Sequence, residues 1–160
     1  MKDFKKDLEK ARKYEEKFSQ LYNQSDLNGH VTWKDEKFDA DYEIEINGRK
    51  FKAEIKIDFT KHNNFFIEHF SNLESGRLGG PLQALKYGAK FFIYWFVSEF
   101  NKHQWDCYVF DTIKLINWME RYGYDYRYAD VHNIGYVTRG NIVPIDILAS
   151  QPFCKKRRIK

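Results

Sequence analysis

The sequence is poor in cysteine and has no long apolar segment. Its two cysteines, Cys107 and Cys154, do not have the spacing of metal-binding cysteine motifs. The longest apolar run, near 91–97, has the length of a strand and falls well short of the roughly 20 residues that cross a membrane. The lysine-rich first residues lack the apolar core of a signal peptide. We therefore expect an intracellular, cytoplasmic protein with reduced thiols and no membrane contact.

Motifs for zinc chemistry and for nucleotide binding are also missing. The five histidines show neither an HExxH pattern nor paired ligand spacing, so we interpret them as structural or surface residues. Residues 76–80 (GRLGG) are rich in glycine but lack the lysine and serine that end a Walker motif. This argues against a phosphate-binding nucleotide loop.

Aromatic residues, in contrast, are abundant: the chain has 14 Phe, 11 Tyr and 4 Trp among 160 residues. They indicate a single packed, β-rich domain and argue against disorder. The net charge of +4 comes from residues 155–160, which hold five basic residues and no acidic one, and without these five the chain has 22 basic and 23 acidic residues. Attraction of nucleic-acid phosphates would come from this segment and the lysine-rich start of the chain, unless the segment only aids solubility or localisation.

Residues 37–58 predict a β-hairpin with one polar and one apolar face. Asn47-Gly48 separates two alternating segments, 37–46 and 49–58, and favours a type I′ turn. Around this turn, facing residues have numbers that add to 95. Odd positions of the first strand and even positions of the second then share the polar face, while the other face can be buried.

The polar face of this hairpin brings two acidic residues together. Most facing pairs on it carry opposite charges: Glu43 with Lys52, Glu45 with Lys50, and Asp39 with Lys56. Asp41, however, falls opposite Glu54, and like charges in facing positions are destabilising unless a cation lies between them. We interpret this mismatch as a hydrolytic metal site; the alternative is an ordinary solvated sheet face.

An acidic residue on one strand followed by Glu-x-Lys on the next resembles the PD-(D/E)XK nuclease superfamily. The matching residues are Asp41 and Glu54-Ile55-Lys56, at a separation similar to that in archaeal-type Holliday-junction resolvases. Ala40 stands where the family name has proline. The resemblance implies an α/β, restriction-endonuclease-like fold with a mixed central β-sheet flanked by helices. We expect it to form one domain over residues 1–150, followed by a basic C-terminal tail at 151–160.

The resemblance also implies a chemistry for these residues. Mg²⁺, or Mn²⁺ as a substitute, would be bound by the carboxylates of Asp41 and Glu54 and by the backbone carbonyl of Ile55. Lys56 would orient the attacking water and offset phosphate charge. Asp39 is the rival of Asp41 as a ligand because it shares the polar face, but the register with Glu54 favours Asp41.

Many members of the superfamily place a further glutamate on the helix before the hairpin. Residues 3–23 predict a helix, and its apolar stripe consists of Phe4, Leu8, Ala11, Phe18 and Tyr22. Glu15 projects into the middle of that stripe, whereas Glu16 lies off it. A carboxylate on a core-facing stripe is expensive to bury unless something binds it. We predict that Glu15 completes the catalytic set; the alternative is a solvated Glu15 paired with a lysine or arginine.

Downstream segments are similar to the rest of phage and bacterial members. Residues 63–69 (NNFFIEH) look like their third strand and make Glu68 a candidate accessory residue, and Gly79-Gly80-Pro81 opens a helix before a buried strand. The further predicted elements are a short strand near 30–35, strand 65–69, helix 81–88, strand 90–97, strand 105–110, helix 112–121 with Asp111 as N-cap, and short strands within 124–148.

The sequence thus predicts a metal-dependent deoxyribonuclease of phage or prokaryotic character, with Holliday-junction resolution as its narrower version. A non-catalytic DNA-binding protein on a nuclease-like fold and a sequence-specific restriction-type endonuclease are the alternatives. DNA is the expected partner, and a homodimer would allow two strands to be cut. The candidate DNA-contacting residues are Lys61, Asn64, Gln83, Lys86, Lys155, Lys156, Arg157 and Arg158.

Overall fold

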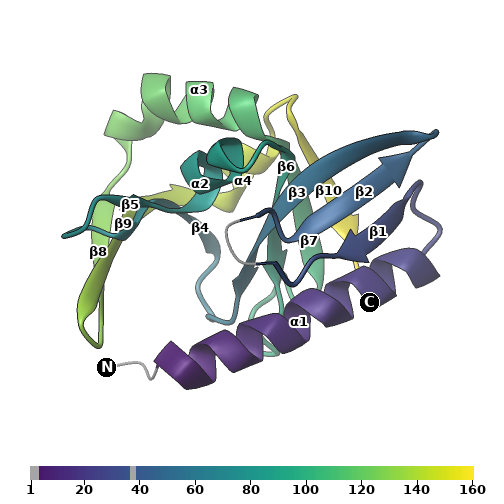
Figure 1. Ribbon diagram of the computed structural model, residues 1–160. Helices are drawn as coiled ribbons and strands as arrows, with labels where there is room; N and C mark the ends of the chain where they lie inside the picture. Colours follow the sequence, from purple (N-terminus) through teal and green to yellow (C-terminus); the bar gives the residue numbers. More distant parts are fainter. Residues whose placement is uncertain (1–3, 37–38) are drawn as a thin grey trace.

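The computed structural model describes residues 4–36 and 39–160. Over these residues the strands form a six-stranded sheet, here called the central sheet, and a four-stranded antiparallel sheet, here called the side sheet (Figure 1). The prediction of an α/β fold with a mixed central sheet flanked by helices is confirmed. Of the helices in the described ranges, none has the length and apolar character needed to cross a membrane.

The central sheet combines parallel and antiparallel pairing. Its strand order is β1-β2-β3-β6-β7-β10, and β3 and β6 run parallel while the other neighbours run antiparallel. The bounds of its strands are His30–Trp33 for β1, Tyr42–Ile46 for β2, Arg49–Asp58 for β3, Ala89–Phe96 for β6, Asp106–Asp111 for β7 and Cys154–Arg158 for β10.

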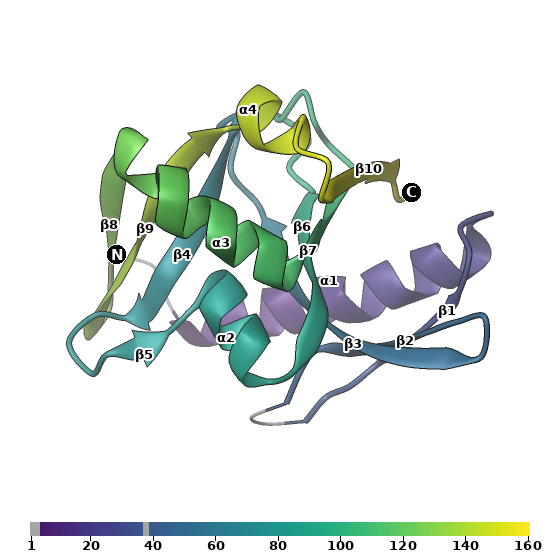
Figure 2. The ribbon, with the colours of Figure 1, turned by 90° about the horizontal axis from the view of Figure 1, so that it is seen from above.

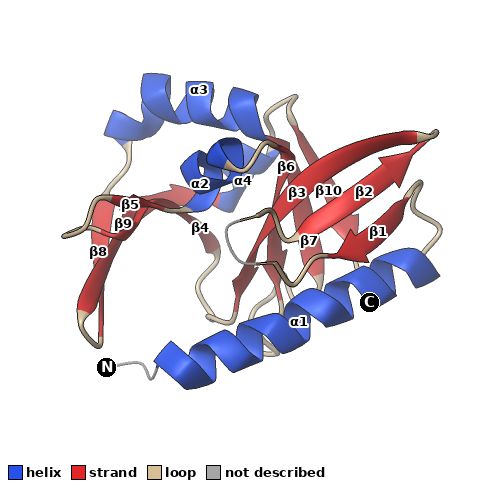
Figure 3. Ribbon diagram, in the orientation of Figure 1, coloured by secondary structure: helices blue, strands red, loops and turns tan. Residues whose placement is uncertain are grey.

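The helices cover both faces of the central sheet. Helix α1 lies along one face, whereas α2 and α3 lie on the other, towards the side sheet (Figures 1 and 3). Seen from above, α2 and α3 lie between the side sheet and strands β6 and β7 (Figure 2). The helices are α1 (Phe4–Gln24), α2 (Gly80–Lys86), α3 (Thr112–Tyr122), the 3₁₀ turn η1 (Gly123–Asp125) and α4 (Ile145–Ala149). The side sheet has the order β5 (Arg77–Leu78), β4 (Asn64–Asn72), β9 (Tyr136–Pro144) and β8 (Tyr128–Asn133).

The hairpin of β2 and β3 has the predicted turn and register. Asn47 and Gly48 have φ values of 52° and 77°, as a type I′ turn requires. Tyr42 faces Ala53, so the facing numbers add to 95 as predicted. However, β2 begins at Tyr42, later than the predicted start at residue 37, and residues 37–38 lie outside the described part of the chain.

A separate core packs on each face of the central sheet. Successive residues of β6 alternate between them, because side chains on a strand point to opposite faces. Phe92 and Tyr94 join the core under α2 and α3, while Ile93 and Trp95 join the core that contains Phe18 of α1. This double burial explains the nearly continuous apolar run that the sequence shows over 91–97.

The basic C-terminal segment is part of the central sheet and does not form a separate tail. Cys154–Arg158 pairs antiparallel with β7 and forms the edge strand β10. Ile159 anchors its end, since this side chain is fully buried and its amide donates to the Trp105 carbonyl at 2.9 Å. The sequence does not predict this strand, because four consecutive exposed charged residues show no alternation of apolar and polar side chains. The sequence reading also missed α4 and β5, which are too short to show a period.

Gly48→Ala is expected to lower the free energy of unfolding by about 1 kcal/mol, because alanine resists a positive φ. A Cβ atom at Gly48 would meet nothing within 4 Å, so the cost is conformational. Gly123→Ala is the matched control: its φ is −59° and its new Cβ would make ordinary contacts at 3.6 Å. Urea denaturation measures both variants. Equal destabilisation would contradict the role of the turn.

Candidate functional site

Asp41 lies where the backbone ladder of the hairpin ends. The last facing pair is Tyr42 with Ala53. One step further, the Asp41 side chain takes the place of the next rung, because its Oδ2 accepts a hydrogen bond from the Ile55 amide at 2.9 Å. This bond holds the Asp41 carboxylate against β3, next to Glu54. The two acidic residues that the sequence places opposite each other therefore meet in the structure.

Glu15 reaches the same end of the hairpin from α1. The Tyr42 hydroxyl donates to the Glu15 carbonyl at 2.7 Å, which fixes this turn of the helix against β2. Trp33 Nε1 donates to Glu15 Oε2 at 3.4 Å. Glu16, in contrast, is exposed. The helix therefore turns Glu15 inward and Glu16 outward; Glu15 is half-buried, and besides Trp33 the charge of Arg12 also acts on it and lowers its pKa.

The three carboxyl groups resist ionisation together. Burial raises the pKa of Asp41 to about 7, and the charge of Glu15 adds to this effect. The pKa of Glu54 is raised to about 9, mainly by burial and in addition by the charges of Asp41 and Glu15. The pKa of Glu15 is raised by its own burial, against the hydrogen bond from Trp33. A cation between these groups would relieve the repulsion and favour their charged forms.

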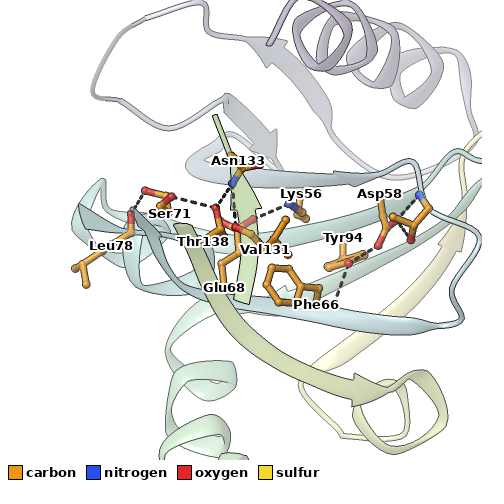
Figure 4. A network of polar contacts seen from close by, with 11 residues as sticks. Lys56, Asp58, Phe66, Glu68, Ser71, Leu78, Tyr94, Val131, Asn133 and Thr138 are labelled. Atoms are coloured by element: carbon orange, nitrogen blue, oxygen red, sulfur yellow. Dashed lines mark hydrogen bonds and ion pairs between the residues drawn. The ribbon is translucent and has the colours of Figure 1, made fainter. Parts of the chain in front are cut away.

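Lys56 lies on the same face of β3 as Glu54 but is held by a different carboxylate. Its Nζ donates to Oε1 of Glu68 on β4 at 2.6 Å (Figure 4). Burial alone would lower the pKa of Lys56, but the charge and hydrogen bond of Glu68, with a smaller contribution from Asp58, raise it. The ammonium group is therefore charged and fixed in place, and Glu68, the candidate accessory residue, positions it.

Gly79 leaves the space in which the Glu68 carboxylate lies. A Cβ atom at Gly79 would come within 2.8 Å of Glu68 Oε2 and of the Ser71 amide. At the next position, Gly80 has a φ of 51° and a Cβ there would lie 2.7 Å from the Glu68 carbonyl. The sequence reading recognised these glycines only as the opening of a helix. The close approach of α2 to β4 gives them a further role.

Asp58 and Tyr94 join the strands that carry Lys56 and Glu68. The Tyr94 hydroxyl donates to Asp58 Oδ2 at 2.5 Å and accepts from the Phe66 amide at 3.0 Å (Figure 4). These bonds link β3, β6 and β4 two residues away from Lys56 and Glu68 on their strands. The sequence reading missed both residues, because a tyrosine in an apolar run gives no sign of a polar partner.

Asp39 is not placed where the sequence reading expected it. Its Oδ1 accepts from Lys52 Nζ and from the Ala40 amide, both at 2.8 Å, and these bonds lower its pKa. It does not face Lys56, because the strand begins only at Tyr42 and the register does not extend to residue 39. Of the two rival aspartates, Asp41 is the one that accepts from the backbone of β3 and lies next to Glu54. Glu43 faces Lys52 in the hairpin, but the Lys52 ammonium group pairs with Asp39. The Glu43 carboxylate instead pairs with Lys50 at 3.5 Å.

The candidate DNA-contacting residues fall into two groups. The first lies around the β3–β4 turn and on α2: Lys61 and Lys86 are exposed, Asn64 begins β4, and Gln83 donates to the Tyr87 hydroxyl at 3.3 Å. The second is the basic strand β10, where all four candidates are exposed. Asp106 is close to two of them, at 3.3 Å from Lys156 Nζ and 3.7 Å from an Arg158 nitrogen.

The acidic cluster, which consists of Glu15, Asp41 and Glu54, offers only oxygen atoms as ligands. Within residues 4–36 and 39–160, no group of three or more His, Cys, Asp or Glu side chains stands in a geometry that could hold a metal ion. The donors nevertheless suit a hard divalent cation such as Mg²⁺, which prefers carboxylate, carbonyl and water oxygens. The Asp41 carboxylate lies against the Ile55 amide and next to Glu54, and the charge of Glu15 acts on both acidic residues.

Comparison of the chain with protein-family models finds no matching family, and a search of curated proteins finds no match. The resemblance to the PD-(D/E)XK superfamily therefore stays a prediction. It is based on Asp41, Glu54 and Lys56, together with Glu15 on the preceding helix.

The raised pKa values predict that the metal-free protein loses stability as the pH rises. A carboxyl group whose pKa is higher in the folded chain than in the unfolded chain binds more protons when folded. The free energy of unfolding therefore falls as the pH rises from the unfolded pKa, near 4, to the folded pKa, which is about 9 for Glu54. In EDTA at pH 9, we expect Glu54→Gln to be more stable than the wild type by on the order of 2 kcal/mol.

The control is Glu45→Gln, an exposed position on the same hairpin. The free energy of unfolding of this variant should change with pH as that of the wild type does. Urea denaturation at pH 5, 7 and 9 gives the comparison. A difference between Glu54→Gln and the wild type that does not grow with pH would contradict the electrostatic account of the cluster.

Proposed function

We propose that this protein is a metal-dependent deoxyribonuclease that hydrolyses phosphodiester bonds in DNA. The observation that carries the proposal is the convergence of Glu15, Asp41 and Glu54, three half-buried carboxyl groups supplied by α1, by the residue before β2 and by β3. A protein gains no stability from such a cluster in its metal-free state. A charged lysine on the same face, two residues after Glu54, adds the cation that phosphate chemistry needs.

The residues have separate roles in this proposal. Asp41, Glu54 and the Ile55 carbonyl would hold Mg²⁺, or Mn²⁺ as a substitute, with Glu15 completing the acidic surroundings. A divalent ion bound there would supply an activated water and stabilise charge on the scissile phosphate. The Ile55 amide fixes the Asp41 carboxylate through Oδ2, and the same carboxylate lies within hydrogen-bonding reach of the Glu54 side chain.

Lys56 orients the water and offsets phosphate charge, and it does not act as a base. The Glu68 carboxylate at 2.6 Å keeps it protonated, and a protonated amine cannot accept a proton. The same ion pair fixes the position of the ammonium group, which a free lysine side chain would not keep.

The narrower proposal is selectivity for DNA structure, with a four-way junction as the preferred substrate. The basic strand β10 and the exposed lysines near α2 supply phosphate attraction on surfaces outside the acidic cluster. Supercoiled, linear, single-stranded and four-way DNA should each be incubated with and without Mg²⁺. Symmetric paired nicks in the four-way junction, in preference to cleavage of linear duplex, are the expected result, and preference for linear duplex would contradict the narrower proposal.

Asp41→Ala and Lys56→Ala are expected to reduce Mg²⁺-dependent DNA cleavage at least about 100-fold, because each removes a group that acts on the reacting phosphate or its water. Lys50→Ala is the matched control, since Lys50 is exposed on the same face of the same strand. Circular dichroism and urea denaturation verify that the variants fold. Undiminished cleavage by either folded variant would refute the assignment.

Glu68→Gln is expected to shift the alkaline limit of cleavage to lower pH. Without the Glu68 charge, burial lowers the pKa of Lys56, so the lysine loses its proton earlier as the pH rises. Rates between pH 7 and pH 10.5 measure this limit, and Glu74→Gln on the exposed β4–β5 turn is the control. An unchanged alkaline limit with a uniformly lower rate would show that Glu68 has only a structural role.

A further inference from the structure

A hollow of about 250 Å³ lies between β4, α2, α3 and the start of β8. Its lining includes His69 of β4, Met119 of α3, Tyr124 of η1 and Tyr128 of β8. Ile67 and His69 face the hollow, while the side chain of Glu68 between them points to the other face of β4 and pairs with Lys56. The hollow and the Lys56–Glu68 pair therefore lie on opposite faces of the same stretch of β4.

Aromatic side chains at the rim of the hollow are unusually open to solvent. Tyr124 is 83% exposed and Tyr128 is 48% exposed. The Tyr128 ring packs against His69, with 5.6 Å between ring centroids. Exposed rings around a concave surface are typical of a site for a planar ligand, because ring faces stack on other ring faces and exclude water.

Asn141 does not itself line the hollow, but it holds His69 in place and fixes its proton. Its side chain is fully buried, and its Nδ2 donates to the carbonyls of Gly123 at 3.3 Å and Tyr126 at 3.1 Å. Its Oδ1 must then accept from Nε2 of His69, 2.5 Å away, which assigns the proton of a neutral imidazole to Nε2. The Nδ1 atom of His69 is left as an acceptor. The same bonds hold the turn that carries Tyr124.

The polar atoms of the hollow accept hydrogen bonds and repel anions. Glu120 contributes a carboxylate and His69 contributes Nδ1, while the lining given by the described residues includes no lysine or arginine. A phosphate group is therefore disfavoured here. A planar heterocycle with N–H donors at its edge fits, since carboxylates accept from the exocyclic amino group of cytosine.

We propose that this hollow binds a nucleobase that has left the duplex or belongs to a single strand, with preference for a base that carries an exocyclic amino group. The proposal deepens the nuclease assignment and rests on it for the identity of the ligand. It places an unpaired nucleotide against β4, the strand whose Glu68 holds Lys56 on its other face, so the preferred DNA would be single-stranded or frayed. The stacking rings are Tyr124 and Tyr128.

The test measures affinity in EDTA, where no cleavage occurs, by fluorescence anisotropy of end-labelled hexanucleotides. The probes are hexa-deoxycytidylate, hexa-deoxythymidylate and an abasic backbone of the same length. The wild type should bind the cytosine probe at least about fivefold more tightly than the abasic one, with thymine in between. Tyr124→Ala and Tyr128→Ala should lose most of this difference. Phe100→Ala, at a 77% exposed aromatic residue that does not line the hollow, should keep it.

Equal affinity of the wild type for the cytosine and abasic probes would overturn the proposal, and so would a difference that survives in both tyrosine variants. Neither result would affect the nuclease assignment, which depends on cleavage by the wild type with Mg²⁺. Conversely, a base-dependent affinity in a protein that cuts no DNA would support the hollow and overturn the nuclease. The two failures are therefore distinguishable.

Discussion

The hydrogen bond from the Ile55 amide to the Asp41 carboxylate continues the hairpin one step beyond its backbone ladder, and the candidate site is built around it. A side chain that substitutes for a backbone rung has a fixed position, so Asp41 cannot turn away from Glu54. Helix α1 then closes over the same end of the hairpin and adds Glu15. Repulsion that would normally separate these groups is thus opposed by one backbone contact and by the packing of a helix.

The lysine nearest to the acidic cluster does not neutralise it. Lys56 shares a face with Glu54, yet its charge is directed to Glu68 on another strand. That separation depends on the way the two sheets meet: Tyr94 ties β6 to β4 through the Phe66 amide, and Gly79 lets α2 approach the Glu68 carboxylate. The acidic cluster and the cation therefore stay side by side as distinct groups, which is the arrangement that a reaction at a phosphate requires.

Local patterns in the sequence predicted the parts of the molecule that depend on local rules. The turn at Asn47-Gly48, the hairpin register, the helix N-cap Asp111, which accepts from the Lys114 amide, and the inward position of Glu15 all follow from φ preferences or from strand and helix periods. These rules act over a few residues, so the pattern and the structure agree.

Long-range contacts were beyond the same reasoning. The Lys56–Glu68 pair, the Asp58–Tyr94 bond and the steric role of Gly79 join separate segments of the chain and leave no periodic pattern in the sequence. Asp39 was placed wrongly because a register that holds inside a strand was extended past its first residue. The edge strand β10 was missed because its position is set by the buried Ile159 and by pairing with β7, and charge composition shows neither.

The basic edge of the central sheet has a consequence for self-association. An edge strand offers free backbone groups on which another strand can add, and many proteins aggregate or dimerise in this way. On β10, however, Lys155, Lys156, Arg157 and Arg158 are all exposed, so a second copy laid alongside would set four cations against four more. Two copies of this chain that come together to cut both strands of a duplex would have to do so through some other face, with β10 left open to polyanions.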